Sequence, residues 1–335
     1  MSLSSSLCKN MVNGRRRFFP LPAIYLDRFV NGAGQRSLSY TGNVMNFQDS
    51  LKRKGAIMVS GMGRSGTSWV GDMINSNNDC RVLFEPFFPG RVPEANGFEY
   101  IQYLNPEHDD PKLARQAGLI LSGRLHNQWV DRSSLPFPCS HILIKDIRTN
   151  LMLGWLKKIE PELRIVVVIR QPLQVILSWK KLKWGRGWAN KKRDIDIILS
   201  QKMLLEDYPV IKEALNLVDI DDFFESLVLQ WCIFQMVPMR QFCDNDIYYL
   251  FYEKLVTRPD EELARLLHFL TMRTEKKLDT SLLLSQSQTN FLGRDYRKDT
   301  DLLLNGWKNE FSLKQREKAQ TIMGLFSLDV PYCYE

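Results

Sequence analysis

The sequence has 335 residues, and 44% of them are hydrophobic, so the chain can bury one large core or two modest ones. Its formal net charge of +7 is a mild positive excess, which suits an anionic ligand but does not require nucleic acid. No apolar run approaches the roughly 20 residues of a membrane-spanning helix, and the N-terminus lacks the pattern of a secretion signal. We therefore expect a cytoplasmic protein that acts on a soluble compound.

Cysteine and histidine do not occur at the spacings of a metal site. The six cysteines include no C-x-x-C pair, and the four histidines are scattered along the chain. We therefore expect no metal ion at the site, and we expect free thiols in a reducing compartment.

Residues 1–54 are expected to form an arm that packs on the domain that follows. They lack a regular apolar pattern and contain three consecutive arginines, Arg15, Arg16 and Arg17. These arginines are interpreted either as a solvated cluster of charge or as a contact to a phosphate.

Residues 56–76 are predicted to form a buried strand, a tight turn and a helix. The turn reads Gly61-Met-Gly-Arg64-Ser65-Gly66-Thr67-Ser68-Trp69. Its three glycines allow a sharp turn with inward-pointing N–H groups, and its hydroxyls lie at the positive end of the helix dipole. The segment therefore predicts a phosphate-binding turn, although a generic glycine-rich turn of an α/β protein has a similar pattern.

The spacing of Gly61 and Gly66 is that of a P-loop, but the chain lacks the lysine of that motif. Thr67 stands where an NTP-hydrolysing loop has the lysine that reaches the β- and γ-phosphates. The cation of the turn is instead Arg64, whose planar fork of donors suits a tetrahedral oxyanion. The turn should hold a phosphate without being built for ATP chemistry.

Two further strands are predicted to end in ionisable residues. The strand at 80–84 leads into Glu85, and the strand at 141–146 carries Lys145 near its end. Ligands of open α/β sheets bind at the carboxyl ends of the strands, so Glu85 is a candidate base and Lys145 should lie at the same rim. A solvated glutamate is the alternative interpretation of Glu85.

The run at 164–169 has the strongest strand signal. It is β-branched almost throughout, which predicts a central strand buried on both faces. Arg170 follows this strand, and Pro172 suits the first turn of the next helix. Ser178 then lies two turns into that helix, where it could converge with Arg170 on one anion.

Two segments are interpreted as insertions that shape an acceptor pocket. Residues 87–140 have little regular apolar pattern, apart from a mixed segment at 112–130 that can form a helix. Residues 179–215 begin with an interleaved basic and aromatic run, 179–193, which is interpreted as a lid or as an exposed connection. Binding of single-stranded nucleic acid is a third interpretation of that run.

The remaining pattern continues the alternation of strand and helix. Helices are predicted at 149–160, 221–243 and 259–270, a strand at 247–253, and a closing helix that begins at Ser312 with the spacing of a capping box. This alternation predicts one doubly wound α/β domain over residues 55–335, with a parallel sheet of about five strands.

Taken together, these motifs resemble the family of sulfotransferases that use 3′-phosphoadenosine-5′-phosphosulfate (PAPS). The run 64–69 resembles the family's loop for the 5′-phosphosulfate, and Arg170 with Ser178 resembles its 3′-phosphate motif. The segments 251–255 and 306–309 follow in the family's order. The resemblance covers about residues 55–325 and implies a P-loop-type fold of three layers, α/β/α.

The resemblance implies a role for each matching residue. Arg64 takes the place of the residue that contacts the bridging oxygen of PAPS, and Arg170 and Ser178 grip the 3′-phosphate. The other residues implied to contact the nucleotide are Ser65, Gly66, Thr67, Ser68, Trp69, Tyr252, Ser287, Arg294, Arg297 and Lys298. PAPS carries phosphates at both ends of its nucleoside and has no γ-phosphate, so two anion sites are expected and Mg²⁺ is not.

The base is the point at which branches of this family differ. The cytosolic small-molecule branch has a histidine after the third strand, where this chain has Lys145-Asp146-Ile147. Tyrosylprotein and carbohydrate sulfotransferases instead resemble the chain in having a glutamate after the second strand. The resemblance therefore implies Glu85 as the general base and Lys145 as a second positive contact to the transferring sulfuryl group.

The acceptor and two rival functions stay open on the sequence alone. A hydroxyl or amine of a small molecule or carbohydrate would suit the same donor site, in a monomer or a homodimer. A P-loop kinase for a small molecule is disfavoured by Thr67. A basic nucleic-acid-binding protein would account for residues 179–193 alone.

Overall fold

The computed structural model describes residues 55–134, 139–182, 184, 193–243, 245–272 and 300–328, all within one compact unit. The expected N-terminal arm lies outside these ranges. Most of the expected lid also lies outside them, namely residues 183 and 185–192. So do four of the residues implied to contact the nucleotide: Ser287, Arg294, Arg297 and Lys298.

Five parallel strands form the central sheet, in the order β2-β3-β1-β4-β5. They are β1 (Ala56–Ser60), β2 (Cys80–Phe84), β3 (His141–Asp146), β4 (Arg164–Ile169) and β5 (Tyr248–Phe251). The register pairs Ser60 with Asp146 and Phe84 with Lys145, so neighbouring strands end at the same level. The predicted α/β fold with about five parallel strands is confirmed.

The central strands are buried on both faces, as their continuous apolar runs predict. All five residues of β1 are buried, and in β4 only Arg164 is partly exposed. Successive side chains of β1 enter different cores: Met58 belongs to the core on one face, and Ile57 and Val59 belong to the core on the other. The sheet is therefore the middle layer of three.

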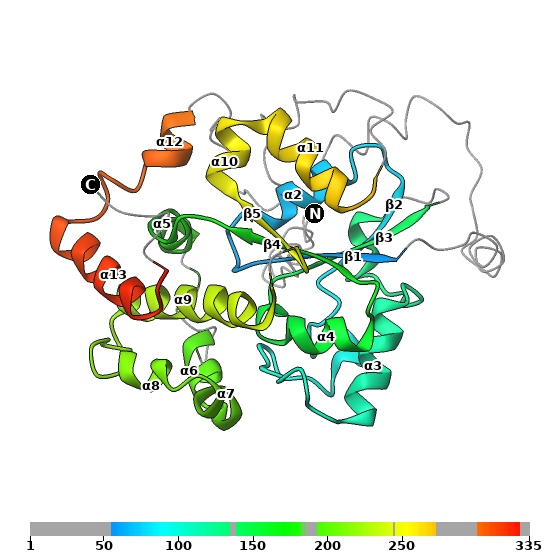
Figure 1. The fold of residues 1–335 in the computed structure, drawn as a ribbon, viewed down its shortest axis with the longest axis horizontal. Helices are drawn as coiled ribbons and strands as arrows, with labels where there is room; N and C mark the ends of the chain where they lie inside the picture. The colour runs from blue at the N-terminus through cyan, green and yellow to red at the C-terminus, as the bar shows by residue number, and fades with distance from the viewer. Residues whose placement is uncertain are drawn as a thin grey trace, which may run out of the picture. The chain divides into compact units, whose positions relative to one another are not determined.

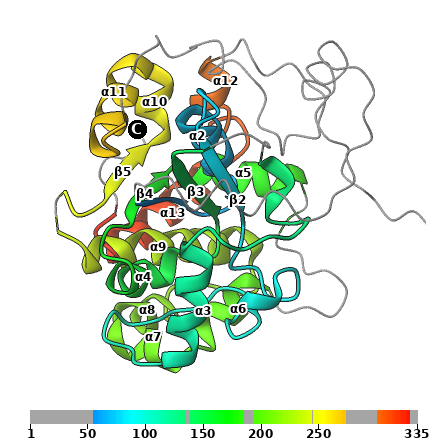
Figure 2. The same cartoon turned by 90° about the vertical axis from the view of Figure 1, so that its right-hand side faces the viewer.

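Helices cover each face of the sheet (Figures 1 and 2). One face carries α2 (Thr67–Ile74), α10 (Tyr252–Thr257) and α11 (Pro259–Phe269), whose apolar side chains share one core. The opposite face carries α3 (Pro111–Leu121), α4 (Leu153–Ile159), α5 (Pro172–Leu182), α9 (Phe223–Gln241) and α13 (Leu313–Leu325). The capping box predicted at Ser312 is present at the start of α13.

The helices that follow two neighbouring strands lie on opposite faces of the sheet. From β1 the chain enters α2 on one face, whereas from β4 it enters α5 on the other face. The loops after β1 and β4 therefore diverge at the carboxyl end of the sheet. Open α/β sheets bind their ligands at such a point.

The segment 193–215, the second part of the predicted insertion 179–215, is largely helical. It forms three short helices, α6 (Asp194–Leu199), α7 (Lys202–Asp207) and α8 (Val210–Ala214). They lie on the side of α9 that faces away from the sheet, as the two views agree (Figures 1 and 2). Buried side chains such as Ile198, Leu204 and Ile211 hold them to the larger core.

One strand is shorter than its sequence predicts. The strand predicted at 247–253 ends at Phe251, because Tyr252 begins α10. This helix turns directly into α11, so the end of β5 is followed by helix without a loop. The sequence pattern also did not predict the short helix α12 (Thr300–Asn305).

Two predicted helices also have different bounds. The segment 112–130 is helical only as α3, where the Asp110 carboxylate accepts the backbone N–H groups of Lys112 and Leu113. The chain leaves this helix through Gly123, whose φ of +68° is left-handed. The helix predicted at 149–160 starts as a 3₁₀ turn at Asn150–Met152 before α4.

Among the described residues, no helix has the length and apolar character needed to cross a bilayer. The four cysteines in the same ranges are free thiols, as expected: Cys80, Cys139, Cys232 and Cys243.

Candidate functional site

The glycine turn between β1 and α2 needs a residue without a side chain at position 66. Gly66 precedes the first residue of α2 and has a φ of +104°, a left-handed conformation that glycine adopts without strain. A Cβ atom here would lie 2.8 Å from the ring of Tyr252. Gly66 therefore lets the turn pack closely against Tyr252, another residue that is expected to contact the nucleotide.

Arg64 lies in the turn with a strained backbone and a neutral hydrogen-bond partner. Its φ is +78°, which is unusual for a residue with a side chain. Its Nε donates to Ser178 Oγ at 3.0 Å, and its guanidinium lies 5.5 Å from the ring of Trp184. Burial and the nearby charge of Arg170 lower the pKa of Arg64 to about 10, against a smaller opposing effect of Tyr252.

Arg170 brings the end of β4 to the same place. Its guanidinium lies 4.1 Å from the Tyr252 ring centroid, and it donates to the Arg64 carbonyl at 3.3 Å. Trp231 Nε1 fixes the backbone by donating to the Arg170 carbonyl at 2.9 Å. The ring of Trp69 also contacts Tyr252, with 5.2 Å between the ring centroids. The residues of both predicted phosphate motifs thus meet in space.

Several polar groups of this site suit a bound anion. Ser65 Oγ and Arg170 Nε are buried and have no hydrogen-bond partner among the residues that the structure describes. No side chain caps the N-terminus of α2 within those residues either, so its N–H groups face the turn. Buried polar groups normally have partners, so oxygen atoms of a phosphate fit the chemistry of this donor set.

Glu85 follows β2 as predicted, but it is buried and not solvated. Only 6% of the residue is exposed, and its φ of +45° is left-handed. One carboxylate oxygen accepts from Lys145 Nζ at 2.7 Å, and the other accepts from Arg148 at 2.8 Å. The pairing of Glu85 with Lys145 agrees with the shared rim that the sequence predicts. Arg148 was missed.

The two cations control the ionisation of Glu85. Burial alone would raise the pKa of this carboxyl, but the charges and hydrogen bonds of Lys145 and Arg148 outweigh it and lower the pKa to about 2. Glu85 is therefore ionised at every physiological pH. A carboxylate held this tightly is a weak proton acceptor for as long as both cations stay on it.

Asp146, the last residue of β3, joins the loop after β2, which contains Glu85, to the loop after β3. Its carboxylate is fully buried and accepts the backbone N–H groups of Phe87 at 2.8 Å and of Arg148 at 2.9 Å. Burial raises the pKa of Asp146 to about 6. The positive charge of Arg148 opposes this shift, and the negative charge of Glu85 adds to it. The sequence signal for Arg148 was the pattern Asp146-x-Arg148 directly after a strand.

Aromatic rings contact the backbone of Glu85 and its partner Arg148. Trp129 Nε1 donates to the Glu85 carbonyl at 3.3 Å. Phe88 lies edge-on to Trp129 and to Tyr100, with 5.4 Å between the ring centroids in both pairs. Arg148 also donates to Tyr100 Oη at 3.2 Å. These rings come from the segment 87–140, the expected acceptor-pocket insertion.

A cavity of about 210 Å³ lies between α5, α6 and the start of α9. Trp179 lines it and donates through Nε1 to the carbonyl of Gly63 at 2.7 Å, so the cavity borders the glycine turn. Asp194 also lines it, and burial raises the pKa of this carboxyl while the attraction of Arg148 lowers it. The other lining residues are Arg193, Ile195, Asp221, Phe223, Ser226, Leu227 and Gln230.

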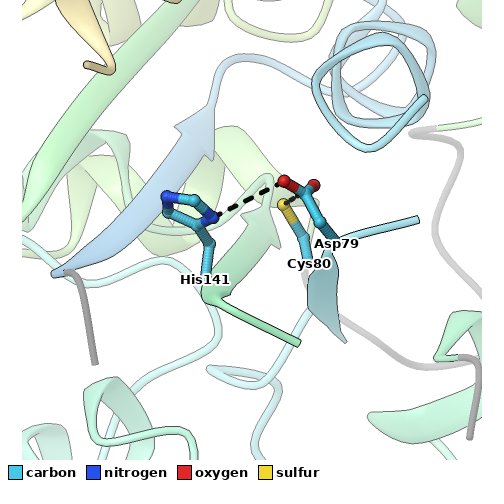
Figure 3. Close-up of side chains that lie close together, drawn as sticks. All are labelled: Asp79, Cys80 and His141. Carbon is cyan, nitrogen blue, oxygen red and sulfur yellow. Dashed lines mark hydrogen bonds and ion pairs between the residues drawn. The ribbon is translucent and has the colours of Figure 1, made fainter. Parts of the chain in front are cut away.

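A separate polar cluster lies at the opposite, amino-terminal edge of the sheet (Figure 3). Asp79 accepts from Cys80 Sγ at 3.5 Å and lies 3.8 Å from His141 Nδ1. Among the described residues, these three form the one group of acidic, cysteine and histidine side chains close enough to share a metal ion. Cys80 begins β2 and His141 begins β3, so the cluster is a full strand length away from Glu85.

A family model described as the sulfotransferase family matches residues 56–276. No curated protein matches the chain. Among solved structures, the sulfotransferase domain from the Synechococcus PCC 7002 olefin synthase is similar, with 16% identity, 84% of this chain and 98% of that chain covered, and a TM-score of 0.45. Mouse sulfotransferase SULT7A1 complexed with PAP matches with 14% identity, 82% and 85% coverage and a TM-score of 0.41.

Retinol dehydratase in a complex with retinol and PAP matches with 17% identity, 87% and 86% coverage and a TM-score of 0.41. The family model alone spans more than half of the chain, from β1 to the residues that follow α11. The protein therefore belongs to the sulfotransferase family.

Proposed function

We propose that the protein transfers the sulfuryl group of PAPS to a hydroxyl, or an amine, of a small-molecule or carbohydrate acceptor. One observation carries this proposal: two phosphate motifs more than 100 residues apart in sequence meet through the hydrogen bond of Arg64 to Ser178. PAPS has phosphates at both ends of its nucleoside, so it needs two such anion sites.

The donor is proposed to lie over the carboxyl ends of β1, β4 and β5. Ser65, Gly66, Thr67 and Ser68 would hold the 5′-phosphate, with the N-terminus of α2 behind it. Arg170 and Ser178 would bind the 3′-phosphate. Trp69 and Tyr252, whose rings already contact each other, would bind the nucleoside. Ser287, Arg294, Arg297 and Lys298 are proposed as further contacts from outside the described residues.

The proposed reaction is an in-line displacement at sulfur. The acceptor oxygen forms a bond to sulfur while the bond from sulfur to the 5′-phosphate oxygen breaks, and the acceptor's proton passes to Glu85. PAP leaves with the negative charge of the broken bond. Arg64 and Lys145 would neutralise that charge, and the glycine turn would hold the phosphate in line. No metal is assigned a role in this step.

Lys145 links binding of the donor to the strength of the base. In the described structure it pairs with Glu85, which holds the pKa of that carboxyl at about 2. A sulfuryl group next to Lys145 would compete for the ammonium, and loss of this contact would raise the pKa of Glu85. Glu85 would then accept a proton more readily when PAPS is bound than when the site is empty.

Nucleotide selectivity tests this function. Calorimetric titration with PAP should show tight binding, and titration with ATP plus Mg²⁺ should show none, because Thr67 replaces the P-loop lysine. A preference for ATP would support a kinase instead. Binding of single-stranded nucleic acid without binding of PAP would support the third interpretation of residues 179–193.

A further inference from the structure

The proposed donor residues and Glu85 occupy different halves of the sheet's carboxyl edge. The donor residues follow β1, β4 and β5, whereas Glu85 and Arg148 follow β2 and β3. The strand order β2-β3-β1-β4-β5 places β2 at the edge farthest from β4 and β5. An acceptor should therefore approach Glu85 from the β2 side.

Arg132 lies on that far side. It belongs to the 3₁₀ turn Asp131–Ser133, which packs against β2. Its guanidinium lies 3.3 Å from the ring centroid of Phe84 and 4.2 Å from that of Trp129. A second guanidinium, that of Arg91, lies 5.5 Å from the same Trp129 ring. Both arginines thus border the aromatic rings around Glu85.

These two arginines have no acidic partner within the part of the chain that the structure describes. No ion pair of Arg91 or Arg132 occurs there. The nearest candidate in sequence, Asp131, pairs with Arg81 at 2.8 Å. Glu85 already holds Lys145 and Arg148. Burial lowers the pKa of Arg132 to about 10, although Glu85 raises it, so Arg132 is charged at neutral pH.

The stacking of Arg132 determines how it can bind. A guanidinium 3.3 Å from the Phe84 centroid stacks on that ring alone, because the Trp129 ring is inclined to the Phe84 ring by 77°. Its N–H groups then lie in its own plane, along an edge directed away from the Phe84 ring. That edge suits a carboxylate, which can accept two parallel hydrogen bonds. Trp129, which Arg132 contacts, packs against Phe88, and Phe88 packs against Tyr100. Arg148 lies over Phe88 and Tyr100, so the ring faces turned away from Arg148 are the apolar surfaces left for the rest of a ligand.

We propose that the acceptor is a phenol that carries a carboxylate, with its hydroxyl at Glu85 and its carboxylate at Arg132, assisted by Arg91 at the exposed rim. The inference rests on the proposed function, because it takes Glu85 to be the base. It adds a specificity determinant: Arg132 selects acceptors by charge and takes no part in binding of the donor.

Three phenols that differ in charge test the proposal. The set is 4-hydroxyphenylacetate, its neutral amide and the cationic amine tyramine, each titrated into the PAP-loaded protein. One charged hydrogen-bonded contact corresponds to about 10- to 100-fold in affinity, so the carboxylate should bind tighter than the amide by that factor and tyramine should bind weakest. With PAPS, kcat/KM should follow the same order.

Arg132→Gln should remove this preference and leave the affinity for PAP unchanged, whereas Arg132→Lys should keep part of the preference. Arg115→Gln is the matched control, because Arg115 is an exposed arginine on α3, away from Glu85. Unchanged PAP affinity shows that each variant is folded.

Equal binding of the three phenols, binding of none of them, or a preference that survives Arg132→Gln would overturn the proposal. Failure of the wild-type protein to bind PAP would instead overturn the proposed function, so the two failures are distinguishable.

Discussion

The two halves of the sheet's carboxyl edge differ in how their charged side chains are paired. Over β1 and β4, Arg64 and Arg170 lie close enough that Arg170 lowers the pKa of Arg64, and their side chains donate to a hydroxyl and to backbone carbonyls. Over β2 and β3, the Glu85 carboxylate pairs directly with both Lys145 and Arg148. We name the residues over β1 and β4 the donor half and those over β2 and β3 the acceptor half, after their proposed roles. The donor half should therefore gain stability when an anion binds, whereas the ion pairs of the acceptor half form without a ligand.

The largest effect should follow from Glu85→Gln. Loss of the base should lower kcat by about 10²- to 10⁴-fold, while PAP affinity in calorimetry stays the same. The variant also leaves two buried cations without their carboxylate, which should cost about 3–5 kcal/mol in the free energy of unfolding.

Glu85→Asp provides the matched comparison. It keeps the charge but shortens the side chain, so it should recover much of the stability and little of the activity. A fully active Glu85→Gln variant would remove Glu85 from the reaction.

A smaller effect is expected from Arg170→Ala, in the donor half. Affinity for PAP should fall by about 1.5–3 kcal/mol, the range for a hydrogen bond to a charged group. The unfolding free energy of the nucleotide-free protein should change far less than in Glu85→Gln, because the variant removes a repulsion with Arg64. Arg115→Ala serves as the surface control. Equal losses of stability in the two halves would contradict the difference between them.

The last expected effect is a pH dependence that belongs to the acceptor half. The pKa of Glu85 is about 2 in the folded protein, below its ordinary value of 4.5. Its contribution to stability is therefore present above pH 4.5 and is lost as the pH falls from 4.5 toward 2. Urea unfolding of the wild-type protein should show this slope.

In Glu85→Gln the slope should be missing. Asp146 contributes a slope of opposite sign between about pH 3.8 and 6, so the comparison is clearest below pH 3.8. Arg64 adds nothing in this acidic range, because its pKa is shifted only to about 10. A parallel slope in both proteins would assign the acid sensitivity to other groups.

The donor half could be predicted from sequence because its signals are local. Glycines, a cation and hydroxyls fall within the nine residues of the turn, and Arg170 and Ser178 lie within one strand-to-helix unit. The pattern of strands then predicts that the turn and Arg170 lie close together, because the carboxyl ends of parallel strands share one edge of the sheet.

The acceptor half depends on contacts that no local pattern contains. Arg148 reaches Glu85 across 63 positions of sequence, and Asp146 reaches the backbone of Phe87 across 59. The burial of Glu85 results from rings supplied by a segment without clear periodicity. The bounds of α3 were missed for a simpler reason: Gly123 ends the helix, although the apolar residues continue.

The backbone of the glycine turn also bears on how the protein could be engineered. Arg64 has a left-handed φ of +78°, a conformation that costs a residue with a side chain of order 1–3 kcal/mol and costs glycine little. Arg64→Gly would relieve that cost and the repulsion from Arg170, so a screen for thermal tolerance would tend to favour it. The same change removes the cation proposed to act at the breaking bond. Selection for heat resistance alone would thus favour a more stable protein that lacks the proposed catalytic cation.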